Sequence, residues 1–184
     1  FGSRADLSDE FIEQVAKLGI LERAKSLAEF KERESLSKEI SAGPRARKVY
    51  HPKLVDAAQA GGRQAKRCTI VFTEGDSAAT FMASGLKGIP EAEHQYWGYF
   101  PLRGKLLNVR QATVKQLANN EELKMIARIV GLREGEDYSS QRAFDGLRYG
   151  RVMILADADD DGHHIKGLVM NYIVHNWPSL ARRD

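Results

Sequence analysis

Two short apolar runs constrain the fold of this sequence most strongly, because each ends directly at an acidic residue. Residues 68–73 (CTIVFT) precede Glu74, and residues 152–156 (VMILA) precede Asp157. Both runs are rich in β-branched or large apolar side chains and have the length of a buried strand. Helical periodicity lies between and after them, over residues 77–86, 111–131 and 164–176. Strands that alternate with helices predict an α/β fold with a mainly parallel sheet flanked by helices.

The other segments predict a less regular organisation. Residues 97–102 predict a further strand, broken by Pro101. Residues 7–40 carry apolar side chains at steps of three or four, which predicts an N-terminal helical segment with a break at Gly19. Residues 41–67 combine glycine and proline with basic residues, which is typical of a linker or a loosely ordered strap. We therefore predict three parts, over residues 1–40, 41–67 and 68–184.

Composition excludes several classes of protein. Hydrophobic residues make up 42% of the chain and charged residues 29%, as in ordinary globular proteins. No apolar run reaches the roughly 18 residues of a membrane helix, so no membrane partner is expected. The single cysteine, Cys68, excludes an internal disulfide framework and lies in an apolar run, where burial is expected. The start, Phe-Gly-Ser without an initiator methionine, predicts that the chain is a piece of something longer.

A cluster of carboxylates follows the second apolar run, in residues 157–162 (DADDDG). Side chains alternate along an extended backbone, so Asp157, Asp159 and Asp161 point to one side if the turn stays extended. At about 5 Å, each pair of carboxylates repels by roughly 3 kcal/mol at an effective dielectric constant of 20. A hard divalent cation offsets this repulsion, and carboxylates with water are the ligands that Mg²⁺ prefers.

Three other interpretations of this turn compete with a magnesium site. An EF-hand loop begins with the same pattern, but its twelfth position requires a bidentate glutamate and is Leu168 here. A phosphatase that uses Asp157 as its nucleophile leaves the other acidic motif without a role. An acidic turn that caps the following helix, where negative charge is favourable, stays open as a purely structural explanation.

The first apolar run ends in the sequence Glu74-Gly75-Asp76-Ser77. Gly75 permits a tight turn, and Asp76 or Ser77 suits the N-cap of the next helix. Capping leaves Glu74 unexplained. Adjacent parallel strands lie about 4.8 Å apart, so Glu74 and Asp157 can share one ion if the two runs are neighbours. Ligands in α/β folds bind at the carboxyl ends of strands, and we predict a metal site there.

A strand ending in Glu-Gly, followed later by a strand ending in D-x-D, resembles the toprim domain of topoisomerases, primases and some nucleases. Longer segments resemble type IIA topoisomerases: EGDSA (74–78), PLRGK (101–105), LNV (107–109) and DADDDG (157–162). Others favour the eukaryotic and viral branch: PKL (52–54), LRYG (147–150), IKGL (165–168) and NWPSL (176–180). The resemblance runs from about residue 11 to the end. Ala158, Asp160, His163 and the loop 87–95 depart from the usual eukaryotic pattern, which leaves a viral or divergent protist enzyme open.

The resemblance implies a Rossmann-like toprim fold that binds Mg²⁺, with Mn²⁺ or Ca²⁺ as substitutes in binding. It implies that Glu74, Asp157 and Asp159 are ligands and that Asp161 contributes directly or through water. Glu74 is also expected to move a proton during catalysis. The resemblance places the following residues in the catalytic, DNA-contacting or drug-binding surroundings of the metal: Gly75, Asp76, Arg103, Gly104, Lys105, His164 and Lys166.

Type IIA topoisomerases are homodimers that cleave and religate double-stranded DNA during ATP-dependent strand passage. The resemblance places the attacking tyrosine and the ATP site in domains outside this chain, and residues 1–40 resemble the end of the transducer region. The isolated chain is therefore expected to be inactive. A nuclear location is expected for a cellular enzyme, and host cytoplasm, host nucleus or virion for a viral one. Another toprim enzyme (a primase or nuclease) or a metal-dependent binding module are the alternatives.

Overall fold

A computed structural model describes residues 8–17, 19–20, 22–28, 30–31 and 47–183. Helix α1 spans Asp9–Lys17. Gly19 has a φ of 65°, which confirms the predicted break in the N-terminal helical segment. The predictions for residues 32–40 and 41–46 lie outside the described residues. None of the described helices has the length and apolar character that crossing a membrane requires.

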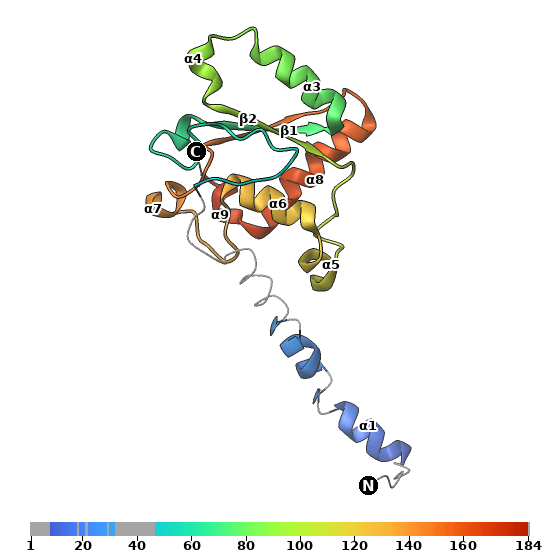
Figure 1. Cartoon of the computed structure of the whole chain (residues 1–184). Coiled ribbons are helices and arrows are strands. Elements are labelled where there is room, and N and C mark those ends of the chain that lie inside the picture. The colour runs from blue at the N-terminus through green and yellow to red at the C-terminus, as the bar shows by residue number, and fades with distance from the viewer. Residues whose placement is uncertain (1–7, 18, 21, 29, 32–46, 184) are drawn as a thin grey trace.

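The described residues form a parallel three-stranded sheet, which confirms the predicted α/β fold (Figure 1). Its strands are β1 (Thr69–Glu74), β2 (Trp97–Leu102) and β3 (Arg151–Leu155), in the spatial order β2-β1-β3. The first five residues of β1 are buried, as expected for a central parallel strand covered on both faces. Pro101 lies inside β2 without interrupting it, because an edge strand tolerates a residue that lacks an N–H group.

Helices cover both faces of the sheet (Figure 1). Helix α3 (Gly75–Leu86) lies on one face, and α6 (Glu121–Val130) and α8 (Asp160–Asn176) lie on the other. Phe72 of β1 belongs to one buried apolar cluster with Ile126 of α6 and Ile165 of α8. The shorter helices are η1 (Ala65–Arg67), α4 (Glu91–His94), α5 (Val114–Ala118), α7 (Gln141–Phe144) and α9 (Pro178–Ala181).

Helix boundaries differ from the predictions where polar side chains or glycine decide them. The predicted helix over residues 111–131 is two helices, because the side chain of Asn120 accepts a hydrogen bond from Leu123 N (2.9 Å) and starts α6 afresh. Gly131 ends α6 in the left-handed conformation, as predicted. The capping interpretation placed Asp76 or Ser77 at the N-cap of helix α3. Helix α3 begins at Gly75, so both residues lie in its first turn instead.

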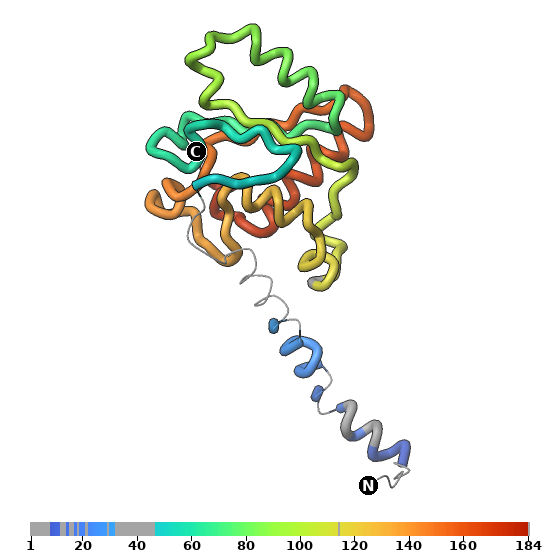
Figure 2. The backbone as a smooth tube through the Cα atoms, viewed as in Figure 1, coloured from blue at the N-terminus to red at the C-terminus, as the bar shows by residue number. Residues whose placement is uncertain are grey.

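Residues 47–61, called the strap below, run beside the outer edge of β2 (Figure 2). Val55 and Tyr99 exchange backbone hydrogen bonds of 3.0 and 2.9 Å. Arg148 donates to the carbonyl oxygens of Ile129 (2.7 Å) and Arg47 (3.4 Å). Its guanidinium also donates to Asp56 of the strap. The described part of the predicted linker is therefore tied to the sheet and to the core.

Candidate metal centre and DNA-contact site

Glu74 and Asp157 meet at the carboxyl edge of the sheet. Strands β1 and β3 are direct parallel neighbours, which is the arrangement required for these two acids to come together. Oε2 of Glu74 accepts a hydrogen bond from the backbone N–H of Asp157 at 3.1 Å. Glu74 is half-buried at the end of β1, whereas Asp157 is exposed. Two acids that are 83 positions apart in the sequence are thus in contact at the edge of the sheet.

The acidic turn does not stay extended to its end, which corrects the expected alternation of its side chains. Asp159 is the N-cap of α8, and its Oδ1 accepts from Gly162 N at 2.8 Å. Asp160 and Asp161 already belong to the first turn of that helix. The helix starts here because the cap satisfies a free backbone donor and the N-terminal end of the helix favours negative charge. The capping interpretation therefore holds for Asp159.

Asp161 faces the loop that follows β2. Its Oδ1 lies 2.8 Å from Nζ of Lys105, and both side chains are more than half exposed. The hydrogen bond from Lys105 lowers the pKa of Asp161, and the same bond raises the pKa of Lys105. Lys105, predicted as a DNA contact, thus lies against the acidic turn.

Two glycines of the predicted site adopt backbone conformations that require glycine. Gly75 has a φ of 74° and Gly104 a φ of 103°, in the left-handed region that other residues avoid. A Cβ atom at either position would meet nothing within 4 Å, so the surface beside both is open. This openness is compatible with close approach of a DNA backbone.

The remaining predicted residues lie in the loop after β2 and in the first turns of α8. Arg103 is exposed, and its backbone N–H donates to Oε1 of Glu122 at 2.5 Å. His164 is exposed in the first turns of α8, and its charge contributes to lowering the pKa of Asp161. Lys166 is partly buried on the same helix.

The donor set at this edge fits a hard divalent cation, although its acids are not gathered around one point. Within the described part of the chain, no three Asp, Glu, His or Cys side chains are arranged to hold one ion. Glu74 and Asp157 are adjacent, and Asp159 uses one carboxylate oxygen in its cap. Every predicted ligand is a carboxylate, the ligand type suited to Mg²⁺. Lys53 forms an ion pair with Asp76, and Lys105 forms one with Asp161. The negative charge of this edge thus attracts cations.

Sequence reasoning missed two residues that shape this edge. Lys53 of the strap binds Asp76, and Glu122 at the start of α6 holds the backbone of Arg103. Lys53 lies in a segment that carries the family resemblance. Its partner Asp76 is 23 residues later, and no local sequence pattern predicts a contact over that separation. Glu122 follows a capping asparagine and is expected from the sequence only as a favourable first-turn acid.

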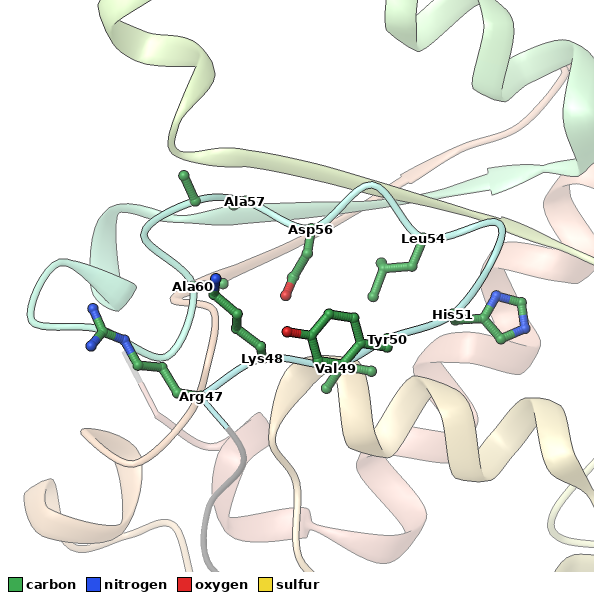
Figure 3. Close-up of a pocket in the computed structure, with 10 residues that line it drawn as sticks. Arg47, Lys48, Val49, Tyr50, His51, Leu54, Asp56, Ala57 and Ala60 are labelled. Carbon is green, nitrogen blue, oxygen red and sulfur yellow. The ribbon is translucent and has the colours of Figure 1, made fainter.

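Hollows lie beside the strap and beside the loop after β2. A hollow of about 730 Å³ is lined by residues of the strap, and its described lining includes none of the predicted site residues (Figure 3). Another hollow, of about 500 Å³, is lined by Lys105 and by residues up to Asn120. Lys105, a predicted DNA contact, therefore lies on a concave part of the surface.

Comparison with known proteins identifies this arrangement. The family model of the Toprim domain matches residues 69–182. The chain belongs to the Toprim family. DNA topoisomerase 2-alpha of Homo sapiens is 46% identical over 182 residues, which cover 99% of this chain and 12% of that protein. DNA topoisomerase 2 of Acanthamoeba polyphaga mimivirus is 47% identical over 184 residues, which cover 100% of this chain and 14% of that protein.

A solved structure supports the same assignment. It is a crystal structure of the DNA-binding, cleavage and re-ligation domain of Plasmodium falciparum topoisomerase II, with a TM-score of 0.67 and 46% sequence identity. The match covers 73% of this Toprim chain and 18% of that chain. These findings confirm the resemblance to eukaryotic and viral type II topoisomerases. The Toprim chain spans only 12 to 14% of the length of these curated relatives.

Proposed function

We propose that this Toprim chain is the Mg²⁺-binding part of a type IIA DNA topoisomerase, which cleaves and religates double-stranded DNA during ATP-dependent strand passage. The observation that carries the proposal is the contact of Glu74 with the backbone of Asp157 at the carboxyl edge of the sheet. It occurs in a chain that is 46% identical over nearly its whole length to DNA topoisomerase 2-alpha.

Glu74, Asp157 and Asp159 would hold the metal, and Asp161 would join them directly or through water. The bound ion supplies stabilisation of the negative charge that develops on the transferring phosphoryl group and on the departing 3′ oxygen. Mn²⁺ or Ca²⁺ would replace Mg²⁺ in binding, since both take carboxylate oxygens. Asp159 can contribute the carboxylate oxygen that its helix cap does not use.

The side chains around the metal would position DNA. Arg103 and Lys105 donate to phosphate oxygens, and Gly104 lets the backbone approach because the space beside it is open. Glu74 moves a proton to or from the 3′ oxygen. His164 and Lys166 at the start of α8 add positive charge toward phosphate. Gly75 and Asp76, with Arg103, would line a drug pocket.

The remaining parts of the reaction belong to the whole enzyme in this proposal. A tyrosine on a neighbouring winged-helix domain attacks the DNA phosphate, ATP binds in a separate N-terminal domain, and the enzyme acts as a homodimer. Residues 1–40 would end the transducer region, 41–67 would link it, and 68–184 would form the metal-binding domain. The enzyme would act in the nucleus of a cell, or in the host cytoplasm, host nucleus or virion of a virus.

Substitution of Glu74 in the full-length enzyme tests this function. We expect Glu74→Gln to lower Mg²⁺-dependent DNA cleavage by about 10²-fold or more, because a charge-stabilising group is removed from the reacting centre. Glu93→Gln is the matched control, since Glu93 forms an exposed ion pair with Arg67 outside the predicted site. Unchanged relaxation of supercoiled DNA by the Glu74→Gln enzyme contradicts the proposal.

A further inference from the structure

Lys53 of the strap reaches the carboxyl edge of the sheet. Its Nζ donates to both carboxylate oxygens of Asp76, at 2.9 and 2.8 Å. We propose that Lys53 is a positioning residue for the metal site. By holding Asp76, it keeps that carboxylate out of the ligand set and directs a divalent cation to Glu74 and Asp157. This inference rests on the proposed function and names a residue outside the predicted ligand set.

Asp76 is a natural competitor for the cation. It lies two residues beyond Glu74, in the first turn of α3, with 73% of its side chain exposed. A Cβ atom on the intervening Gly75 would meet nothing within 4 Å, so the surface between the two acids is open. Two carboxylates at this spacing offer oxygens to a hard cation. Lys53 occupies both oxygens of Asp76 and neutralises its charge.

Contacts other than the ion pair also hold the turn that carries Lys53. The backbone N–H of Lys53 donates to Nδ1 of His51 at 3.1 Å, and Leu54 N donates to the carbonyl oxygen of His51 at 3.0 Å. The His51 ring packs edge-on against Phe100 of β2, with centroids 5.1 Å apart. Figure 3 shows His51 pointing away from the hollow of the strap. Exposed ion pairs usually contribute little because ordering long side chains costs entropy, and this turn reduces that cost.

The strap is also anchored on the other side of Lys53. Val55 forms its backbone bridge with Tyr99, two residues after the lysine. Asp56 follows and accepts hydrogen bonds from the buried Arg148 and from the hydroxyl of Tyr149. The position of Lys53 relative to the end of β1 is therefore set by β2 and by the core, which suits a residue that positions another.

Binding of Mn²⁺ to the full 184-residue chain, measured by titration calorimetry and by electron paramagnetic resonance of the free ion, tests this role. We expect Lys53→Met to tighten Mn²⁺ binding by about two- to fivefold, because Asp76 then becomes available to the cation. Asp76→Asn in the Lys53→Met background should remove this gain, and Lys53→Arg should bind as the unsubstituted chain does.

Lys66→Met is the matched control, because it also removes one positive charge from an exposed ion pair, with Asp145 (2.6 Å). It should leave Mn²⁺ affinity unchanged. Unchanged or weaker Mn²⁺ binding by Lys53→Met overturns the inference, and so does a gain that persists with Asp76→Asn, since that gain would reflect the general field. Mn²⁺ binding that is unaffected by Glu74→Gln overturns the proposed metal site together with this inference.

Discussion

Arg148 shows how much one residue contributes to the arrangement of the site. Only 2% of it is exposed, and its guanidinium donates to Asp56 of the strap and to the carbonyl oxygens of Ile129 and Arg47. Nε of Arg148 has no hydrogen-bond partner among the described residues. Burying a cation of this kind requires desolvation, which is costly. Removing one member of a buried ion pair destabilises the fold more than replacing both members, because the other charge is left buried and unpaired. Arg148 therefore determines where the strap, and hence Lys53, lies.

Replacing Arg148 should destabilise the fold strongly. Arg148→Met leaves the carboxylate of Asp56 without its buried cation, so we expect the free energy of unfolding to fall by about 3–5 kcal/mol. Urea denaturation followed by circular dichroism measures this change. Lys66→Met, which breaks an exposed pair with Asp145, should cost less than about 1 kcal/mol. An equal loss of unfolding free energy in both variants would show that the burial of Arg148 does not make its ion pair more important to stability.

At the scale of an element, the start of α8 decides the shape of the acidic turn. Gly162 lies so close to the turn that a Cβ atom there would be 2.1 Å from the carbonyl oxygen of Asp157. Asp157 and the cap of Asp159 can lie as they do only because residue 162 has no side chain. Gly167 is on the same helix, and a Cβ atom there would meet nothing within 4 Å.

Alanine substitutions of these two glycines should act in opposite directions. Gly162→Ala should lower the free energy of unfolding by about 1–3 kcal/mol through the clash with backbone. It should also weaken Mn²⁺ binding, because the acidic turn must move. Gly167→Ala should raise the free energy of unfolding by up to about 1 kcal/mol through its higher helix propensity, and leave Mn²⁺ affinity unchanged. Equal stability of the two variants in urea would contradict this account of the turn.

At the scale of the whole molecule, buried tyrosines join segments that are far apart in the sequence. The hydroxyl of Tyr172 on α8 donates to the carbonyl oxygen of Leu123 on α6 at 3.0 Å. The hydroxyl of Tyr149 donates to Asp56 and accepts from Ala57 N at 2.9 Å. Burial raises the pKa of both tyrosines, and the carboxylate of Asp56 raises that of Tyr149 further.

The raised tyrosine pKa values predict a loss of stability at alkaline pH. The unfolded chain releases these protons from a pKa near 10.0, whereas the folded chain keeps them. The stabilisation is complete below pH 10 and is lost as pH rises toward the folded pKa. For two such groups, the free energy of unfolding should fall by about 2–3 kcal/mol between pH 8 and 11.

A variant without these two hydroxyls provides the comparison. Tyr149→Phe combined with Tyr172→Phe should be less stable at pH 8, because Asp56 and Ala57 N lose a partner. Its further loss between pH 8 and 11 should nevertheless be smaller by about 2–3 kcal/mol. Urea denaturation at both pH values measures the difference, and identical pH dependence of the two proteins would contradict it.

Local patterns in the sequence predicted much of the fold and the centre of the candidate site. The runs at 68–73 and 152–156 are apolar enough to be recognised as strands, and both became neighbouring parallel strands. The meeting of Glu74 with Asp157 follows from that, because parallel neighbours end at the same edge. The break at Gly19 and the stop at Gly131 were also predictable, since each needs a positive φ.

By itself, the sequence determined the strands, the long amphipathic segments that become helices and the two acids that meet at the sheet edge, because apolar periodicity is a property of single segments. The tertiary structure alone decided the partners of Asp161, Asp76 and Arg148. Lys53 is 23 residues from Asp76, and Asp56 is 92 residues from Arg148, so no local pattern relates them. The acidic turn curls at Asp159 because a helix cap competes with extended backbone there, and packing of α8 against the core settles that competition.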